Sequence, residues 1–256
     1  MIEVDSLTVA FEEITALDAV DATVTDGEFV TIVGASGCGK TTLLRTIAGL
    51  QAPTAGRVRI DGQPPVVARS AGEIGVVFQQ HTLFPWKTAL ENVTFLRRMA
   101  GLKPEPEKAR TLLETVGLGE FTARYPSELS GGMCQRVAIA RALHLDASVL
   151  LMDEPFGELD ELTRDQLGIE LRALWRRERP TVLFVTHSVP EAVLLADRCL
   201  LVSGPPGKIV ERFEIDLPRP RDERVFESAS FQRQVGAIRS ALHATARPLD
   251  GTRIRR

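Results

Sequence analysis

Residues 34–42 read GASGCGKTT, and this stretch decides the fold of the chain. Its glycines at the first and sixth positions, followed by Lys40 and Thr41, have the spacing of a phosphate-binding P-loop. The apolar, β-branched run 29–33 precedes the loop, and a segment with helical spacing, 42–48, follows it. A strand, a glycine turn and a helix are the context that the motif requires. The chain is therefore predicted to have an α/β fold with a P-loop NTPase core.

The residue types of the loop suit a triphosphate. Glycines let backbone N–H groups and a helix N-terminus face an anion, Lys40 adds a compact positive charge, and the Thr41 hydroxyl is a ligand for Mg²⁺. The alternative is a glycine-rich turn that binds nothing, but the lysine and hydroxyl would serve no purpose there. The expected nucleotide contacts are Gly34, Ala35, Ser36, Gly37, Cys38, Gly39, Lys40, Thr41 and Thr42.

The composition is that of an ordinary soluble protein. The 256 residues are 44% hydrophobic and 25% charged, and the net charge of −3 gives no reason to expect nucleic acid as a partner. The three cysteines show no paired spacing, so we expect neither disulfides nor a zinc site. The longest apolar stretch, 192–202, contains Asp197 and Arg198 and is far shorter than the roughly 20 residues that span a bilayer. With no export signal evident, we expect a cytoplasmic protein that reaches a membrane only through a partner.

The first part of the chain predicts strands. Residues 2–10 and 16–24 alternate apolar and polar residues, which predicts an N-terminal antiparallel β-subdomain, and 57–60 and 74–78 are further strand candidates. The ring of Phe11 lies at the turn between the first two strands, where an aromatic side chain either stacks on a nucleotide base or simply packs.

A helical insert follows. Residues 88–99 and 105–116 have helical periodicity, and the inserted α-helical subdomain is predicted over about residues 81–145. Ser130, Gly131 and Gly132 precede the helical run 137–144 like a cap. A second helix N-terminus is therefore presented to an anion.

Two strand ends carry groups for phosphate chemistry. The apolar strand 149–152 ends in Asp153, a candidate Mg²⁺ ligand, and Glu154, a candidate base for water. The strand 181–186 delivers His187 to the same sheet edge. The plainer alternatives are two acidic residues opening a loop and a structural histidine, and the nearby P-loop argues against the first. Lys40, Glu154 and His187 are the predicted catalytic residues.

The P-loop, LSGG at 129–132, LLMDEP at 150–155 and a downstream histidine occur in the order of the ATP-binding cassette (ABC) ATPases, which the chain resembles over about residues 1–215. The resemblance implies that Phe11 stacks on the base and that Gln79 links Mg²⁺ and water to the transporter surface. Residues 130–135, including Gln135, resemble the signature that contacts the γ-phosphate held by the opposite subunit. His187 resembles the switch histidine, and 157–160 the loop that crosses between the two sites.

Within the family the chain is similar to importer ATPases for nitrate, alkanesulfonates and taurine. The similarity lies in LFPWKTALENV at 83–93, RYPSELSGGMCQRVAIARAL at 124–143, MDEPFGELDELTR at 152–164 and DLPRPR at 216–221. Three residues depart from the pattern. Cys134 stands where an arginine is usual, Glu158 where a small residue is usual, and Ser188 where an aspartate is usual.

The resemblance implies an ATPase of transmembrane transport. The expected assembly is a head-to-tail homodimer of cassettes that binds ATP and Mg²⁺, with Thr41, Gln79 and Asp153 at the metal. The expected partners are integral membrane permease subunits, through which an external solute-binding protein acts, so the chain would lie on the inner face of the cell membrane. The alternatives are an importer ATPase for a thiamine-precursor pyrimidine, a soluble cassette ATPase acting on DNA or the ribosome, and a module that only binds ATP. Trp86 in the insert is either a permease contact or part of the core.

Residues 216–256 are predicted to form an extension beyond the cassette. They contain several arginines, a moderately helical stretch near 223–246 and a basic end at Arg253, Arg255 and Arg256. A solvated tail is the expectation, and the few terminal charges attract anionic lipid only weakly.

Overall fold

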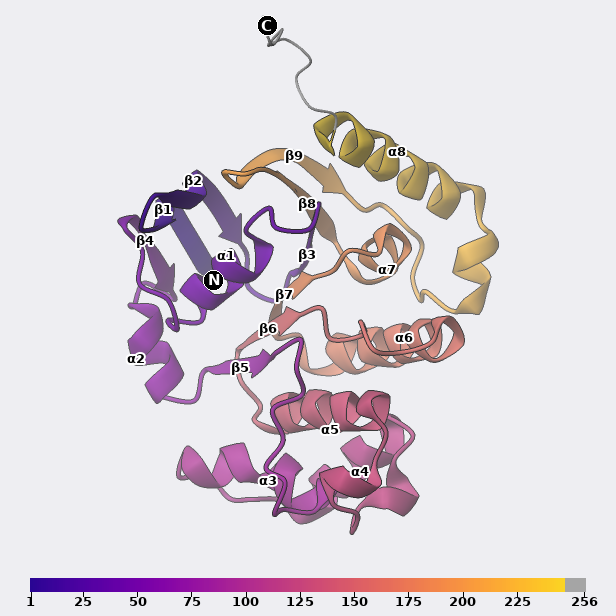
Figure 1. The fold of residues 1–256 in the computed structure, drawn as a ribbon. Coiled ribbons are helices and arrows are strands. Elements are labelled where there is room, and N and C mark those ends of the chain that lie inside the picture. The colour runs from indigo at the N-terminus through magenta and orange to yellow at the C-terminus, as the bar shows by residue number, and fades with distance from the viewer. Residues whose placement is uncertain (247–256) are drawn as a thin grey trace, which may run out of the picture.

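The computed structural model describes residues 1–246 and contains two sheets (Figure 1). The smaller sheet is antiparallel and has the strand order β2-β1-β4. Its strands are β1 (Ile2–Phe11), β2 (Ile14–Val24) and β4 (Ala55–Ile60). The predicted N-terminal antiparallel β-subdomain is confirmed. Side chains on one face of these strands, such as Ile2, Val4 and Val9, are buried in a core that they share with residues of the larger sheet.

The larger sheet has the order β5-β6-β7-β3-β8-β9. Its first five strands are mutually parallel and only β9 runs antiparallel, against β8. The strands are β3 (Phe29–Gly34), β5 (Ile74–Val77), β6 (Val149–Asp153), β7 (Thr181–Val185), β8 (Arg198–Ser203) and β9 (Lys208–Glu214). Strands β3, β6 and β7 are buried along their whole length, as near-continuous apolar runs in parallel sheets are.

Helices cover both faces of the parallel sheet. Val149 and Leu151 of β6 belong to the core that includes α1 (Lys40–Ile47), whereas Leu150 and Met152 belong to the core that includes α5 (Gly131–His144) and α6 (Glu161–Glu178). Successive residues of a strand point to opposite faces. Helices α1 and α5 therefore pack on opposite sides of β6.

The helical subdomain contains α3 (Ala89–Met99), α4 (Pro106–Thr115) and α5, and Figure 1 shows it at the end of the molecule away from the small sheet. Thr88 is the N-cap of α3 and forms a capping box with Glu91. The Thr88 hydroxyl oxygen accepts from the backbone N–H of Glu91, and the Glu91 carboxylate accepts from the backbone N–H of Thr88. Fully buried Asn92 fixes the preceding loop through Phe84 and Lys87. The short α2 (Pro65–Ser70) joins β4 to β5 and begins at a pair of prolines, because proline suits the first position of a helix.

The expectation of a solvated tail is wrong for the described part of the C-terminal extension. After α7 (Val189–Leu195) and β9, the chain forms a short 3-10 helix (Glu223–Glu227) and then α8 (Ala229–Ala246). The apolar residues of this segment join a core with α7 and β8. Its buried members are Leu217, Val225, Phe231, Val235 and Ile238. The basic end at residues 253–256 lies outside the described residues.

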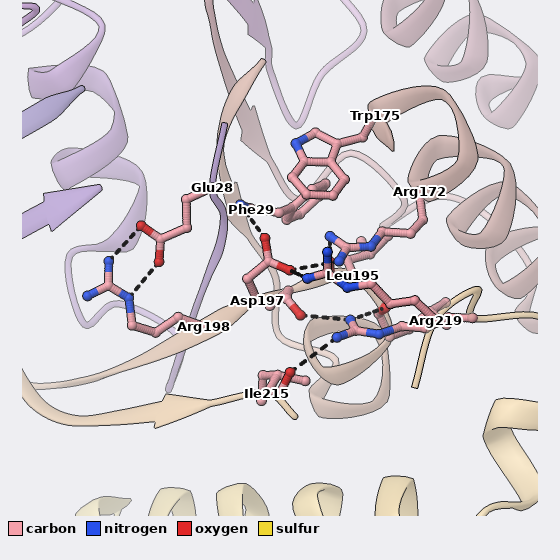
Figure 2. A network of polar contacts seen from close by, with 12 residues as sticks. Glu28, Phe29, Arg172, Trp175, Leu195, Asp197, Arg198, Ile215 and Arg219 are labelled. Atoms are coloured by element: carbon pink, nitrogen blue, oxygen red, sulfur yellow. Dashed lines mark hydrogen bonds and ion pairs between the residues drawn. The ribbon is translucent and has the colours of Figure 1, made fainter. Parts of the chain in front are cut away.

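A polar network ties the extension to the sheet (Figure 2). The carboxylate of Asp197 accepts hydrogen bonds from the backbone N–H of Phe29 (3.1 Å), from Arg172 of α6 (2.7 Å) and from Arg219 of the extension. Arg172 also donates to the carbonyl of Leu195 at the end of α7 (2.6 Å). One carboxylate thus links the first residue of β3 to two helices and to the chain beyond residue 215.

Arg221 makes a second link. Its guanidinium is buried and donates to the carbonyls of Leu194 (2.8 Å) and Ala196 (2.7 Å) at the end of α7, and of Ile215 (3.3 Å). Burial lowers the pKa of Arg221 to about 10, so the side chain stays charged at neutral pH. The guanidinium supplies donors to helix-end carbonyls that would otherwise have none.

No helix of residues 1–246 is long and apolar enough to cross a bilayer.

Phe231→Ala should destabilise the protein if α8 belongs to the core. The Phe231 ring is 2% exposed and packs edge-on against Phe226 at 5.4 Å between centroids. We expect the free energy of unfolding, measured in urea, to fall by about 3 kcal/mol. Arg233→Ala on the exposed face of the same helix is the control and should change it by less than about 0.5 kcal/mol. Equal stabilities for both variants would contradict the core assignment.

Candidate functional site

The P-loop follows the central strand β3, and close contacts fix its shape. A Cβ on Gly34 would lie 2.4 Å from the carbonyl oxygen of Val202, so only glycine fits beside β8. Gly39 begins α1 with a φ of 95°, in the left-handed region, and a Cβ there would lie 2.7 Å from the carbonyl oxygen of Ala16. The loop is therefore held between β8 and the start of β2.

Lys40 lies at the first turn of α1 and is 6% exposed. Its Nζ donates to the carbonyl oxygens of Gly34 (2.9 Å) and Ala35 (3.0 Å). No carboxylate within residues 1–246 forms an ion pair with it. The ammonium is thus held inside the loop with its charge uncompensated, which favours an anion beside it.

Thr41 and Asp153 meet across the gap between α1 and β6. The Thr41 hydroxyl donates to Asp153 Oδ1 at 3.1 Å. Asp153 is 2% exposed, and burial, with the charge of Glu154 adding to it, raises the pKa of its carboxyl. A buried carboxylate that is costly to ionise is a group that a bound cation would stabilise.

Two other predicted site residues, Gln79 and His187, form hydrogen bonds with the carboxylate of Glu154. Its Oε2 lies 3.5 Å from Gln79 Nε2 and 3.3 Å from His187 Nδ1. Gln79 follows β5 and His187 follows β7, so three strand ends bring these side chains together. The backbone of Glu154 has a φ of 45°, in the left-handed region. The carboxylate is partly exposed, at 21%, and can meet a solvent molecule.

A buried glutamate supports the His187 segment. Glu191 Oε2 accepts from the Thr186 hydroxyl, and Thr186 Oγ1 in turn accepts from the backbone N–H of Ser188 (2.9 Å). Ser188 begins α7 as its N-cap. Burial raises the pKa of Glu191 to about 7. The two residues that flank His187 are thereby fixed from inside the protein.

The signature segment begins α5. Ser130 is the N-cap and its Oγ accepts from the backbone N–H of Met133 (3.2 Å), while residues Ser130 and Gly131 are exposed. The structure differs from the expectation at Gln135. Its side chain is 1% exposed and donates to the carbonyl of Phe78 (3.0 Å), so it joins α5 to the segment of Gln79 and does not face the open edge. The side chain lies one turn after Gly131 on the same face of α5, but the segment at Phe78 covers this part of the helix.

Phe11 is 45% exposed at the end of β1. It pairs with Ile14 across the turn of the hairpin that also carries Ala16, whose carbonyl approaches Gly39. An exposed ring on a hairpin that contacts the P-loop is suited to stacking on a flat group bound there.

The residues of this edge fit a nucleotide with a divalent cation. Lys40 provides an uncompensated charge, the glycines leave backbone N–H groups without covering side chains, and Thr41 and Asp153 present two oxygens 3.1 Å apart. Oxygen donors of this kind suit Mg²⁺, which takes one or two protein ligands and keeps waters.

Sequence reasoning missed the residues that hold the site from behind. The spacing Ser188-x-x-Glu191 has the form of a capping box and marks the start of α7, but the glutamate side chain bonds Thr186 instead of the cap N–H. No sequence signal shows that Asp197 accepts from Phe29 or that Arg221 joins α7, because these partners are far apart in the chain.

The fold and this edge define a P-loop nucleotide-binding protein. Residues 17–157 match the family described as ABC transporter, and the chain belongs to this family. It is an ATPase, as the resemblance implied. The fold class expected from the sequence is also confirmed.

Relatives by sequence include ATP-binding proteins named for taurine and nitrate import. The chain is 48% identical to an uncharacterized ABC transporter ATP-binding protein of Methanocaldococcus jannaschii, over 91% of this chain and 89% of that protein. It is 42% identical to a taurine import ATP-binding protein of Rhizobium johnstonii, over 96% and 97%. A nitrate import ATP-binding protein of Synechococcus elongatus is 43% identical, over 84% and 80%. The similarity to nitrate, sulfonate and taurine importer ATPases is confirmed.

Solved structures agree in fold. A bacterial ABC transporter cassette in a dimeric structure is 33% identical and has a TM-score of 0.77, over 85% of this chain and 100% of that one. The same cassette in a post-hydrolysis state, bound to ADP and phosphate, gives the same values.

Protonation of Glu191 should make stability depend on pH. Because its folded-state pKa is raised from 4.5 to about 7, the folded protein binds this proton more tightly than the unfolded chain does. The free energy of unfolding of the wild type should therefore fall, relative to Glu191→Gln, by about 3 kcal/mol as the pH rises from 4.5 to 7. Urea unfolding of both proteins across this range measures it. A constant difference between them would show that Glu191 does not titrate there.

Proposed function

We propose that this chain is the ATP-hydrolysing subunit of an importer for a small anion or organic solute such as a sulfonate, taurine or nitrate. The observation that carries the proposal is the carboxylate of Glu154, which lies next to buried Asp153 and is approached by Gln79 and His187. The two relatives named for taurine and nitrate import support the solute class.

Binding of ATP begins at the P-loop. The loop N–H groups and Lys40 take the β- and γ-phosphates, and the Phe11 ring stacks on the base. Thr41, Asp153 and Gln79 would hold Mg²⁺, which would supply positive charge to neutralise the phosphate oxygens. That charge would keep Asp153 ionised although burial raises its pKa.

Hydrolysis uses the groups around Glu154. Its carboxylate takes the proton of a water molecule whose oxygen attacks the γ-phosphorus, and the bond to the β-phosphate oxygen breaks to leave ADP and phosphate. His187 and Gln79 hold the carboxylate in place through Oε2. Lys40 stabilises the charge that develops on the phosphoryl oxygens.

A second copy of the chain completes each site. Helices α1 and α5 pack on opposite faces of β6, so the P-loop and Ser130 of one chain begin helices in different layers, which favours their contact with different phosphates. In a head-to-tail homodimer the Ser130 helix of one cassette faces the γ-phosphate in the other. The dimeric form of the similar cassette supports this arrangement.

The permease partner is assigned to the helical subdomain. Between this subdomain and the sheet lies an apolar groove, beside which the exposed Trp86 ring packs on Phe84 at 5.6 Å between centroids. Its apolar lining includes Phe78, Phe84, Leu96, Met99, Ala100 and Leu145, and Arg69, Ser70, Thr82 and Arg141 also line it. A short amphipathic helix of an integral membrane permease would fit there, close to Gln79. The chain would then work on the cytoplasmic, inner face of the membrane, with an external solute-binding protein acting through the permease.

Glu154→Gln should separate binding from turnover. The amide keeps the size of the side chain but cannot take the proton from water, so the turnover number should fall by about 10²–10⁴-fold. Binding of a fluorescent ATP analogue should persist, since Lys40 and the loop are unchanged. Steady-state phosphate release and equilibrium titration measure the two quantities. Turnover equal to that of the wild type would refute the role of Glu154.

Trp86→Ala should weaken the permease complex without harming the cassette. The Trp86 side chain is 69% exposed, so its loss should change the free energy of unfolding by less than about 0.5 kcal/mol. Co-purification of tagged cassette with its membrane permease should be reduced, with Val210→Ala on exposed β9 as a control. Capture of ribosomes or DNA in place of a permease would contradict the transport function.

A further inference from the structure

Glu158 lies directly against the signature glycines of its own chain. Its Oε2 is 2.6 Å from the position that a Cβ on Gly131 would take, and Leu159 Cδ2 is 2.9 Å from the corresponding position on Gly132. Gly131 is the first residue of α5, next to the N-cap Ser130. A carboxylate therefore sits at the helix N-terminus to which the proposed function assigns a γ-phosphate.

The charge of Glu158 is not neutralised nearby. Within residues 1–246 it forms no ion pair, and its side chain is exposed. Its charge acts on the neighbouring helix turn, because it adds to burial in raising the pKa of the Cys134 thiol. Cys134 is neutral and 3% exposed, so it brings no positive charge to offset the carboxylate.

The turn that carries Glu158 is held at both ends. The backbone N–H of Gly157 donates to the carbonyl of Glu154 (3.1 Å), and Leu159 donates to Phe156 (3.1 Å). Asp160 caps α6 by accepting from Thr163 N–H (3.0 Å). The backbone of the turn is thus fixed, and the carboxylate can leave Gly131 only by rotation of its own side chain.

We propose that Glu158 competes, within its own chain, with the γ-phosphate of the ATP held by the second copy, and so sets the ATP concentration at which the dimer closes. A helix N-terminus attracts negative charge, so the carboxylate is favourably placed in the separate cassette. The phosphate needs the same N-terminus, and two negative groups a few ångströms apart repel. Closure therefore requires the Glu158 side chain to turn away. This inference rests on the proposed function.

The test compares Glu158→Gln with the unmodified residue. In the Glu154→Gln background, in which turnover is slow, ATP with Mg²⁺ is titrated and dimer formation is followed by light scattering. Removal of one like charge at this distance should lower the half-saturating ATP concentration about tenfold. The difference should shrink as KCl is raised, since salt screens exposed charges. The half-saturating ATP for turnover, measured with Glu154 intact, should fall in parallel.

Glu161→Gln is the matched control, because Glu161 is an exposed carboxylate three residues further along at the start of α6 and does not contact Gly131. An equal effect of this variant would overturn the inference by showing that any loss of negative charge suffices. Unchanged or higher half-saturating ATP for Glu158→Gln would also overturn it. If the chain with native Glu154 and Glu158 fails to hydrolyse ATP, and the Glu154→Gln chain fails to dimerise with ATP, the proposed function itself fails. If the protein hydrolyses ATP and dimerises but Glu158→Gln changes neither half-saturating concentration, the inference about Glu158 is wrong and the proposed function stands.

Discussion

The parallel pairing of β6 with β7, and of β7 with β3, is the constraint on which the site depends. In this pairing, Val185 of β7 lies opposite Asp153 of β6 on one side and opposite Ile32 of β3 on the other. The residues that follow on these strands therefore leave the sheet at one edge, which brings Glu154 within 3.3 Å of His187. Because successive side chains of these strands pack into two different cores, a one-residue shift of register would move each side chain into the wrong core, so the packing of both cores holds Glu154 and His187 in place.

The sequence was sufficient for features whose signals are local. The P-loop, the helix starts at Thr88 and Ser130, and the buried strands β6 and β7 each depend on a few consecutive residues. A capping side chain bonds within its own first turn, and a strand buried on both faces reads as an unbroken apolar run. The strand 181–186 predicts His187 at the sheet edge of Glu154, and the family resemblance implies that Gln79 lies near Mg²⁺ and water. In the structure, hydrogen bonds join both side chains to Glu154.

Features that depend on distant partners were not predictable. Arginines after residue 215 indicate a solvated tail by composition, yet Arg221 is buried because carbonyls of α7, more than twenty residues earlier, accept from it. Likewise, Gln135 belongs to a motif that suggests contact with nucleotide, but its side chain is buried because the carbonyl of Phe78, from a distant segment, accepts from it. The same holds for Glu158, whose contact with Gly131 joins two motifs that are separate in sequence.

The backbone conformation of Glu154 has a consequence for stability. With a φ of 45° it occupies a conformation that glycine or asparagine adopts more easily, at a cost of about 1–2 kcal/mol for other residues. Neither of those residues offers a carboxylate. Glycine at this position would relieve the strain but would remove the carboxylate that the proposed function requires, so stability and turnover oppose each other at this residue. Thermostabilised versions of this protein obtained without an activity screen would be enriched in inactive ones.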